Sequence, residues 1–456
     1  MNAPIYSERR QRLATLMQGG VAVIPTSPER KRNRDSHYPY RFDSYFYYLT
    51  GFAEPDAVLV LIAGDKPASI VFCRDKDVER EIWDGFRCGP EGARQTFGFD
   101  VAHALARLDE TMPDLLADQP KLFYAIGADP AWDTRIVGWL NKVREKARSG
   151  VAAPNQLSDV RVLLDEMRLI KSADEIAIMR RAAQITAGAH RRAMRIAQPG
   201  LAEYEIEAEL LHEFRRHGAQ APAYTSIVAS GVNACVRHYV RNDAQLKEGD
   251  LVLIDAGCEL DGYAADITRT FPANGKFGAV QKDVYQLVLA AQAAAIDAIK
   301  PGSNWAAPHD AAVRVLTQGM IDFKLIEGPV DAAIESEAYK KFYMHRTGHW
   351  LGLDVHDAGD YKRDGEWRVL KAGMAMTVEP GCYIRPDDKV PERFWNIGIR
   401  IEDDVLVTDQ GREVLTADAP KTIADIETLM GEPNQRSAVN ANRIQRGAAT
   451  ATRGKP

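Results

Sequence analysis

Two aspartates, Asp255 and Asp266, flank a segment whose sequence predicts a tight hairpin. Asp261-Gly262 is a strong signal for a two-residue turn, and with that turn position 257 faces Asp266. Asp255 lies two residues from position 257 and so on the same side of its strand. We therefore expect the two carboxylates to be diagonal neighbours, about 7 Å apart or less at Cβ, provided that no bulge intervenes.

Such a pair needs a chemical explanation. Two buried carboxylates repel unless one is protonated or a cation lies between them, so Asp255 and Asp266 predict a metal site. The alternative is that one of the two aspartates only caps a turn at the surface.

Further groups of the same kind follow along the chain. His345, His349 and His356 fall within twelve residues of a chain that has 10 histidines in all. Glu379 precedes Pro-Gly, and Glu402 lies two residues after Arg400, so that Arg400 and Glu402 share a strand face. A single glutamate of this kind is most often structural, but the order Asp, Asp, His, Glu, Glu predicts a specific set of ligands.

The elements that must position these groups are short strands. Residues 251–255, 374–379 and 396–402 are strand-like, and each segment ends in a carboxylate. Upstream, Ser172 and Glu175 have the form of a capping box, which predicts the start of a helix whose buried stripe includes Ala182 and Ile185. A second amphipathic helix is predicted over 203–217, ended by Gly218.

The first part of the chain reads as a separate α/β domain. A helix is predicted over 7–18 and buried strands over 57–62 and 69–73. We place the boundary between 165 and 175, which divides the chain into an N-terminal α/β domain, a catalytic domain and a tail predicted to be disordered: 1–172, 173–430 and 431–456.

Composition excludes several classes of protein. The chain has 456 residues, 58 basic and 64 acidic side chains and a net charge of -6, which argues against a general nucleic-acid binder. The sequence has no apolar run of signal-peptide or membrane-span length, so we expect a soluble cytoplasmic protein. The five cysteines show no CxxC spacing and are predicted to be buried thiols.

The ligand order resembles that of the pita-bread metallopeptidases, which include methionine aminopeptidase, prolidase and Xaa-Pro aminopeptidase. The segment from His345 to Asp357 is similar to the signature of the proline-specific branch, and Ala234-Cys-Val-Arg-His238-Tyr to its substrate histidine region. Three upstream segments look like the N-terminal domain of bacterial Xaa-Pro aminopeptidase (aminopeptidase P): Tyr38-Pro-Tyr-Arg41, Tyr48-Leu-Thr-Gly-Phe52 and Glu54-Pro-Asp-Ala-Val-Leu-Val60. The resemblance spans roughly residues 7–430 and implies an α/β (α+β) chain, in which a creatinase-like N-terminal domain precedes a pita-bread catalytic domain.

The resemblance also implies the metal site and its chemistry. Asp266 and Glu402 would bridge two divalent ions, Asp255 would bind one of them, and His349 and Glu379 the other. Four carboxylates and one imidazole form a hard site that suits Mn²⁺, although Co²⁺ and Zn²⁺ are also admitted. Two such ions share a water and lower its pKa, which gives a bridging hydroxide for peptide hydrolysis.

The remaining site residues receive their roles from the same resemblance. Glu379 would also move a proton to the departing proline nitrogen, and Arg400 would hold a ligand carboxylate in place. His356 and His238 would contact the substrate, with His345 supporting them; the alternative for His238 and His345 is a packed histidine satisfied by backbone partners. Tyr224 and His238 are candidate walls of a proline pocket, which must accept an amide without an N–H donor.

The family's N-terminal domain implies assembly into a homo-oligomer, a dimer or a tetramer. Trp83 is then a candidate lid residue for a neighbouring subunit's pocket, and its alternative is a place in the core. The expected partners are peptides with proline in second position, with no nucleic acid and no membrane. Arg346 departs from the family pattern, where we expect a smaller residue, and this puts the shape of its loop in doubt.

Three other functions remain open at this point. Prolidase has the same ligands but accepts only Xaa-Pro dipeptides. Creatinase shares the fold without a metal, and the retention of all five ligand types argues against it. A binding module on an inactive peptidase fold would be expected to have lost ligand positions that are intact in this sequence.

Overall fold

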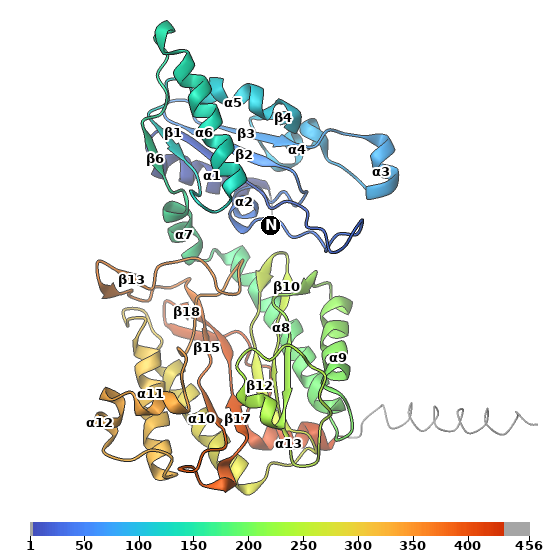
Figure 1. The fold of residues 1–456 in the computed structure, drawn as a ribbon, viewed down its shortest axis with the longest axis vertical. Coiled ribbons are helices and arrows are strands. Elements are labelled where there is room, and N and C mark those ends of the chain that lie inside the picture. Colours follow the sequence, from blue (N-terminus) through green and yellow to red (C-terminus); the bar gives the residue numbers. More distant parts are fainter. Residues whose placement is uncertain (1–2, 433–456) are drawn as a thin grey trace, which may run out of the picture. The chain divides into compact units, whose positions relative to one another are not determined.

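The computed structural model describes residues 3–432 and divides the chain into two compact units, Met1–Arg168 and a second that begins at Leu169 (Figure 1). The structural boundary therefore lies inside the predicted interval of 165–175. Of the tail predicted to be disordered, 431–456, residues 433–456 lie outside the described residues, whereas Gly431 ends the helix Ile423–Gly431 and Glu432 pairs with Arg195 at 3.0 Å, so the predicted start of the tail is too early. Within residues 3–432, no helix has both the length and the apolar character needed to cross a bilayer.

The first unit is a mixed six-stranded sheet with helices on its faces. Its strand order is β4-β3-β2-β1-β5-β6, in which β1 pairs antiparallel with β2 and parallel with β5. The strands are β1 Gly20–Pro25, β2 Val58–Ala63, β3 Ala68–Cys73, β4 Val101–Ala104, β5 Lys121–Phe123 and β6 Gln156–Ser158. The helices are α1 Ala3–Met17, α2 Ser44–Thr50, α3 Val78–Asp84, α4 Gly89–Phe97, α5 Leu108–Leu116, α6 Pro130–Glu145 and α7 Arg161–Leu169.

Side chains that alternate along the strands point to opposite faces of the sheet, and each face packs against its own helices. Val21 and Val23 of β1 and Val58 and Val60 of β2 pack in one cluster with α5 and α6, which supply residues such as Trp139. Helices α1 and α2 contact strand β2 as well. The predicted strands 57–62 and 69–73 are present within one residue of their predicted bounds, whereas α1 starts at Ala3 rather than at residue 7.

The second unit combines long helices with short, paired strands. Its helices are α8 Ala173–Ile196, α9 Glu203–Arg216, α10 Ala279–Ala298, α11 Ala307–Asp322, α12 Val330–Glu335 and α13 Ile423–Gly431. Its strands are β7 Ala221–Pro222, β8 Ile227–Ser230, β9 Leu251–Asp255, β10 Cys258–Leu260, β11 Tyr263–Ala264, β12 Thr268–Pro272, β13 Lys362–Arg363, β14 Glu366–Trp367, β15 Ala375–Val378, β16 Gly381–Ile384, β17 Ile397–Arg400, β18 Asp403–Thr408 and β19 Gly411–Val414. In Figure 1, strands β12, β15 and β17 lie between the helix pair α8–α9 and the pair α10–α11.

Helix α8 begins where its sequence predicts. Ser172 is the N-cap, the Glu175 backbone N–H donates to its hydroxyl at 3.4 Å, and the Ser172 backbone N–H donates to the Glu175 carboxylate at 2.8 Å. Ala182 and Ile185 of the predicted stripe are buried, because this face packs on the core of the unit. Helix α9 ends at Arg216, one residue before the predicted end.

The hairpin at Asp261-Gly262 has the predicted register. Leu260 pairs with Tyr263, and Asp255 pairs with Thr268, so one register runs through both paired segments without a bulge. Position 257 therefore faces Asp266, and a Cβ at Gly257 would meet the carbonyl oxygen of Ala265 at 1.6 Å. The close approach of the two strands at this point requires glycine.

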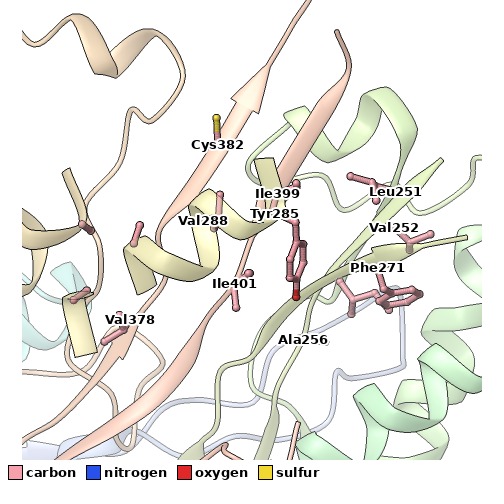
Figure 2. Packing of buried hydrophobic residues seen from close by; sticks show 14 of the residues in the cluster. Leu251, Val252, Ala256, Phe271, Tyr285, Val288, Val378, Cys382, Ile399 and Ile401 are labelled. Carbon is pink, nitrogen blue, oxygen red and sulfur yellow. The ribbon is translucent and has the colours of Figure 1, made fainter. Parts of the chain in front are cut away.

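The core of the second unit lies between its strands and helix α10. Figure 2 shows Tyr285 and Val288 of α10 near Ile399 and Ile401, with Phe271 of β12 in the same cluster. Apolar packing among β9, β12, β17 and helix α10 thus holds these three strands in place. The strands carry or adjoin the predicted ligands.

The cysteine prediction is correct with one exception. All five thiols are free, and Cys73, Cys235, Cys258 and Cys382 are buried. Cys88 is only partly buried, because it lies at the start of α4 rather than in a sheet core.

Candidate active site and metal centre

One cavity of about 290 Å³ in the second unit brings together ten of the predicted site residues. They come from the segments 224–238, 255–266, 345–356 and 379–402 and are Tyr224, His238, Asp255, Asp266, His345, His349, His356, Glu379, Arg400 and Glu402. Trp83 belongs to the first unit, where it lies on α3 with 83% of its surface exposed. The alternative that Trp83 packs in a core is therefore wrong.

Asp255 and Asp266 point to a common place, as the hairpin register requires. One carboxylate oxygen of each aspartate accepts a hydrogen bond from the Tyr224 hydroxyl, at 2.6 Å for Asp255. The hydroxyl has a single proton, so the approach of both oxygens shows how closely the two carboxylates converge. The backbone supports this placement, because the Ala256 N–H donates to the carbonyl of Ile267 at 3.1 Å.

Glu402 lies beside these two aspartates although it comes from a distant part of the sequence. It lies between β17 and β18, and its backbone N–H donates to the Thr268 carbonyl on β12 at 3.0 Å. The Thr268 hydroxyl donates to the Glu402 carboxylate at 2.6 Å and accepts from Arg400 Nε at 3.1 Å. Arg400 Nη2 forms a short ion pair with Asp255. Arg400 and Glu402 thus act on one side of the chain, as their two-residue spacing predicts.

His349 and Glu379 complete the group. Glu379 directly follows β15, and its backbone N–H donates to the Thr347 carbonyl at 2.7 Å. His349 Nδ1 lies 2.9 Å from the Trp350 carbonyl oxygen, which only accepts, so this nitrogen carries a proton. Its Nε2 lies 3.5 Å from Asp266 Oδ2 and 3.8 Å from Glu379 Oε1.

The electrostatics show an excess of negative charge in this cavity. Burial, followed by the charges of Asp266 and Glu379, raises the pKa of Glu402 well above its usual range. Burial likewise raises the pKa of Glu379 to about 7 and the pKa of Asp255 above its ordinary value. Burial disfavours charge on His349, yet Asp266 and Glu379 raise the pKa of its imidazole to about 9. The metal-free protein therefore holds protons in this cluster near neutrality.

These residues fit a divalent metal centre. Asp266, His349 and Glu402 each offer a ligand atom, and the three atoms lie within 4.8 Å of one another. His349 donates from Nδ1 to a backbone carbonyl, which is the usual support for a histidine that binds a metal through Nε2. Burial and then the neighbouring acids raise the pKa values of Glu379 and Glu402, and a bound cation would offset both effects.

The other histidines form a wall beside the carboxylates. His345 Nε2 lies 2.9 Å from the Tyr383 hydroxyl and its Nδ1 lies 2.8 Å from the Arg346 carbonyl. Burial and the charge of Arg400 lower the pKa of His345 to about 3, so it is neutral. His356 packs edge-on against His349, with ring centroids 4.2 Å apart, and both His356 and His238 are exposed at the cavity.

Two residues that hold this site together were not predicted from the sequence. Thr268 links Arg400 to Glu402. Tyr383 links His345 to Arg400, because Arg400 Nη1 donates to the Tyr383 hydroxyl at 3.1 Å. Tyr383 lies in β16 shortly after Glu379, and the hairpin register places Thr268 opposite Asp255. Nearness to Glu379 and Asp255 is the only feature of the sequence that could have pointed to Tyr383 and Thr268. Their contacts join separate strands or residues more than a hundred positions apart, which no local pattern predicts.

Comparisons with known proteins agree with this geometry. Residues 177–409 match the model of metallopeptidase family M24, and residues 6–124 match the aminopeptidase P N-terminal domain. The chain is 47% identical over 427 residues to the Xaa-Pro aminopeptidase of Haemophilus influenzae, which covers 93% of this chain and 96% of that protein.

Solved structures give the same result. The aminopeptidase PepP of Pseudomonas aeruginosa has a TM-score of 0.93 and 53% sequence identity, covering 94% of this chain and 98% of that one. A zinc-substituted Escherichia coli aminopeptidase P in complex with product has a TM-score of 0.92 and 45% identity, with coverage of 94% and 98%. The chain therefore belongs to metallopeptidase family M24 and carries the N-terminal domain of aminopeptidase P ahead of a pita-bread catalytic domain.

Proposed function

We propose that this protein is an Xaa-Pro aminopeptidase, which hydrolyses the bond between an N-terminal residue and a following proline in peptides. The observation that carries the proposal is the single cavity in which four buried or half-buried carboxylates and His349 converge beside three further histidines. Its relatives at 47% and 45% identity over most of both chains are named Xaa-Pro aminopeptidases.

The metal ligands are Asp255, Asp266, His349, Glu379 and Glu402, and the ions that suit this oxygen-rich set are two Mn²⁺. The resemblance to the family makes Asp266 and Glu402 the residues that would be shared by the two ions, with Asp255 holding one ion and His349 and Glu379 the other; all five residues line the cavity. When bound, two such ions polarise the scissile carbonyl and lower the pKa of the attacking water.

The protein's own residues handle the proton and the substrate. Glu379 takes the proton of the attacking water and delivers it to the departing proline nitrogen, a task for which its place in the cavity beside His349 fits it. His356 and His238, both exposed at the cavity, contact the substrate carbonyl and the proline side of the scissile bond. Arg400 positions Asp255, and His345 supports Tyr383 through its Nε2.

Selectivity for proline requires a site that makes no use of an amide N–H at the second residue, since proline has none. Tyr224 and His238 line the cavity and are the proposed walls for the proline ring. The Tyr224 hydroxyl is already engaged by Asp255 and Asp266, so its ring is left as an apolar surface.

Prolidase is the alternative, because it would use the same ligands on Xaa-Pro dipeptides only. The test is hydrolysis of Arg-Pro-Pro and Gly-Pro by protein stripped with a chelator and reloaded with Mn²⁺, with Arg-Ala-Pro as the control without proline in second position. Release of arginine from Arg-Pro-Pro but not from Arg-Ala-Pro supports the proposal. Cleavage of Gly-Pro alone indicates a prolidase, and cleavage of neither peptide, with metal bound, indicates a binding module.

The same proposal extends to assembly and location. Trp83 lies on the exposed α3 with exposed Ile82, and exposed Phe86 follows the helix; Trp83 is the proposed lid over the pocket of a neighbouring subunit in a dimer or tetramer. Light scattering of the wild type and of Trp83→Ala, with kcat/KM for Arg-Pro-Pro, tests this. Five free thiols fit a reducing cytoplasm, which imaging of the tagged protein checks.

A further inference from the structure

A second cavity adjoins the catalytic one. Its volume is about 480 Å³, and Arg237 lines both cavities. Tyr383 lines the second cavity, and its hydroxyl lies 2.9 Å from Nε2 of His345, which lines the first. Arg237 and the Tyr383–His345 pair are therefore shared boundaries of the two cavities.

The second cavity is held by contacts between three segments of the chain. Arg385, directly after β16, donates from Nη2 to the Cys235 carbonyl at 2.8 Å. The Cys235 thiol lies 3.8 Å from the Ile384 carbonyl, and the Tyr383 backbone N–H donates to the Phe342 carbonyl at 2.9 Å. These contacts fix the backbone two residues before Arg237 and place the two arginines at one opening.

The charge of this cavity is strongly positive. Its lining includes Arg237, Arg385 and Lys341, and among these only Lys341 has a carboxylate partner within residues 3–432, Asp387 at 3.0 Å. Arg237 has no ion-pair or hydrogen-bond partner in that part of the chain, and both arginines are exposed. Two guanidinium groups are thus available to a ligand, and guanidinium recognises carboxylate with two parallel hydrogen bonds.

A short peptide has matching charges at its ends. Its N-terminal ammonium is repelled by arginine and attracted by the carboxylates of the catalytic cavity, whereas its C-terminal carboxylate has the opposite preference. In Xaa-Pro-Yaa, the carboxylate lies about two residues beyond the scissile carbonyl, or roughly 7 Å in an extended chain. Arg237 lines the catalytic cavity itself, and Arg385 lies further along the second cavity.

We propose that Arg237, followed by Arg385 in the adjoining cavity, forms a subsite that binds the free C-terminal carboxylate of short peptide substrates on the leaving side of the scissile bond. The proposal rests on the proposed aminopeptidase function and names a preference of that same site. Arg237 binds the C-terminal carboxylate of tripeptides, and Arg385 binds that of longer peptides.

The test compares Ala-Pro-Ala with its C-terminal amide on the Mn²⁺-loaded enzyme. We expect the wild type to have a lower KM for the free acid, and Arg237→Gln to raise that KM about fivefold, the upper range for an exposed ion pair. The variant should leave kcat within twofold and the KM for the amide unchanged. Arg241→Gln is the matched control, because Arg241 lies in the same segment, pairs with Asp243 at 2.6 Å and lines neither cavity.

A second measurement uses peptide length and salt. Arg385→Gln, which keeps an N–H donor for the Cys235 carbonyl, should raise the KM of Ala-Pro-Ala-Ala-Ala more than that of Ala-Pro-Ala. The KM of the free acids should also rise with ionic strength more steeply than that of the amides.

The outcomes separate the subsite from the function on which it rests. Equal KM values for acid and amide in the wild type, or equal effects of Arg237→Gln on both, would overturn the subsite while the aminopeptidase activity stands. Cleavage of neither substrate by loaded wild-type enzyme would overturn the proposed function and the subsite with it.

Discussion

Two neighbouring carboxylates, Glu402 and Asp403, have opposite environments. Asp403 is fully buried and accepts from Arg269 at 2.7 Å, from Lys421 at 2.6 Å and from the Thr416 hydroxyl at 2.7 Å. Burial opposes its charge, but Arg269 and Lys421 lower the pKa of Asp403 below its usual value. This acid has two cations of its own.

Glu402 has no such compensation. It accepts from the Thr268 hydroxyl, and Arg400, the cation that lowers its pKa, is already paired with Asp255. Burial together with Asp266 and Glu379 raises the pKa of Glu402 well above its usual range. Adjacent acids of similar burial thus differ because one faces fixed cations and the other faces more acids.

The comparison distinguishes a structural acid from an acid that awaits a cation. Within this pair, the carboxylate that packs in the fold is neutralised by cations of the chain, whereas the carboxylate in the cavity is left with neighbouring acids. Glu402 belongs to the cavity with Asp266 and His349, and Asp403 belongs to the packing between β18 and helix α10. Four predictions test this distinction, in order of decreasing effect.

Replacement of Glu379 by glutamine should abolish nearly all turnover. The change removes a proposed metal ligand that is also the proposed proton carrier, so we expect kcat for Arg-Pro-Pro to fall at least about 10³-fold. The free energy of unfolding of the metal-free variant should equal or exceed that of the wild type, because one acid of a repulsive cluster is gone. Activity close to wild type would contradict the role of Glu379.

Replacement of Asp403 by asparagine should act on stability. The buried Arg269, whose side chain has 0% exposure, would lose its carboxylate partner, so the free energy of unfolding in urea should fall by about 3–5 kcal/mol. The matched control is Glu402→Gln, which should leave the stability of the metal-free protein unchanged or raise it. Equal losses in the two variants would contradict the comparison.

Two substitutions of Arg400 distinguish the contribution of its hydrogen-bond geometry from that of its charge. Its guanidinium donates to Thr268 and Tyr383, each at 3.1 Å, as well as to Asp255. Arg400→Lys keeps the charge but cannot make all three contacts, so kcat should fall about 10- to 100-fold, and Arg400→Met should fall further. The metal content of each variant, measured by mass spectrometry, shows how much of the loss comes from ligand placement. Equal kcat values for the lysine and methionine variants would show that the charge contributes nothing.

The pH dependence of the metal-free protein should reveal the uncompensated acids. The pKa of Glu379 rises from 4.5 to about 7 on folding, so its contribution to stability is present below pH 4.5 and is lost as the pH rises through 7. His349, raised to about 9, has the same sign. Asp403, with a lowered pKa, loses stability only in acid.

Thermal melting in the presence of a chelator should therefore show the Tm of the wild type falling relative to that of Glu379→Gln from pH 4.5 to pH 7, by several degrees at about 2–4 °C per kcal/mol for a domain of this size. The comparison cancels the opposite contribution of buried neutral histidines such as His345, which both proteins share. A Tm difference between the two proteins that stays constant over this range would contradict the assignment.

Much of the local structure followed from the sequence. The start of α8 at Ser172 depends on a capping box of four residues, and the placement of Asp255 and Asp266 on one face depends on a two-residue turn and the period of a strand. These features involve residues close in the chain, so propensity and periodicity are sufficient to predict them. The positions of β15 and β17 were also predicted, although Glu379 and Glu402 follow these strands by one and two residues rather than ending them.

The contacts that decide what each group does came only from the tertiary structure. Thr268 meets Glu402 across 134 positions, and Arg400 meets Asp255 across 145. No local pattern predicts such pairs, because they arise when separate strands pack on one core. Glu402 and Asp403 are adjacent in the sequence and chemically alike, and only packing brings Arg269 and Lys421 to one and further acids to the other. The sequence thus indicated which residues are candidates to bind a metal, and the fold determined that they lie together in one cavity.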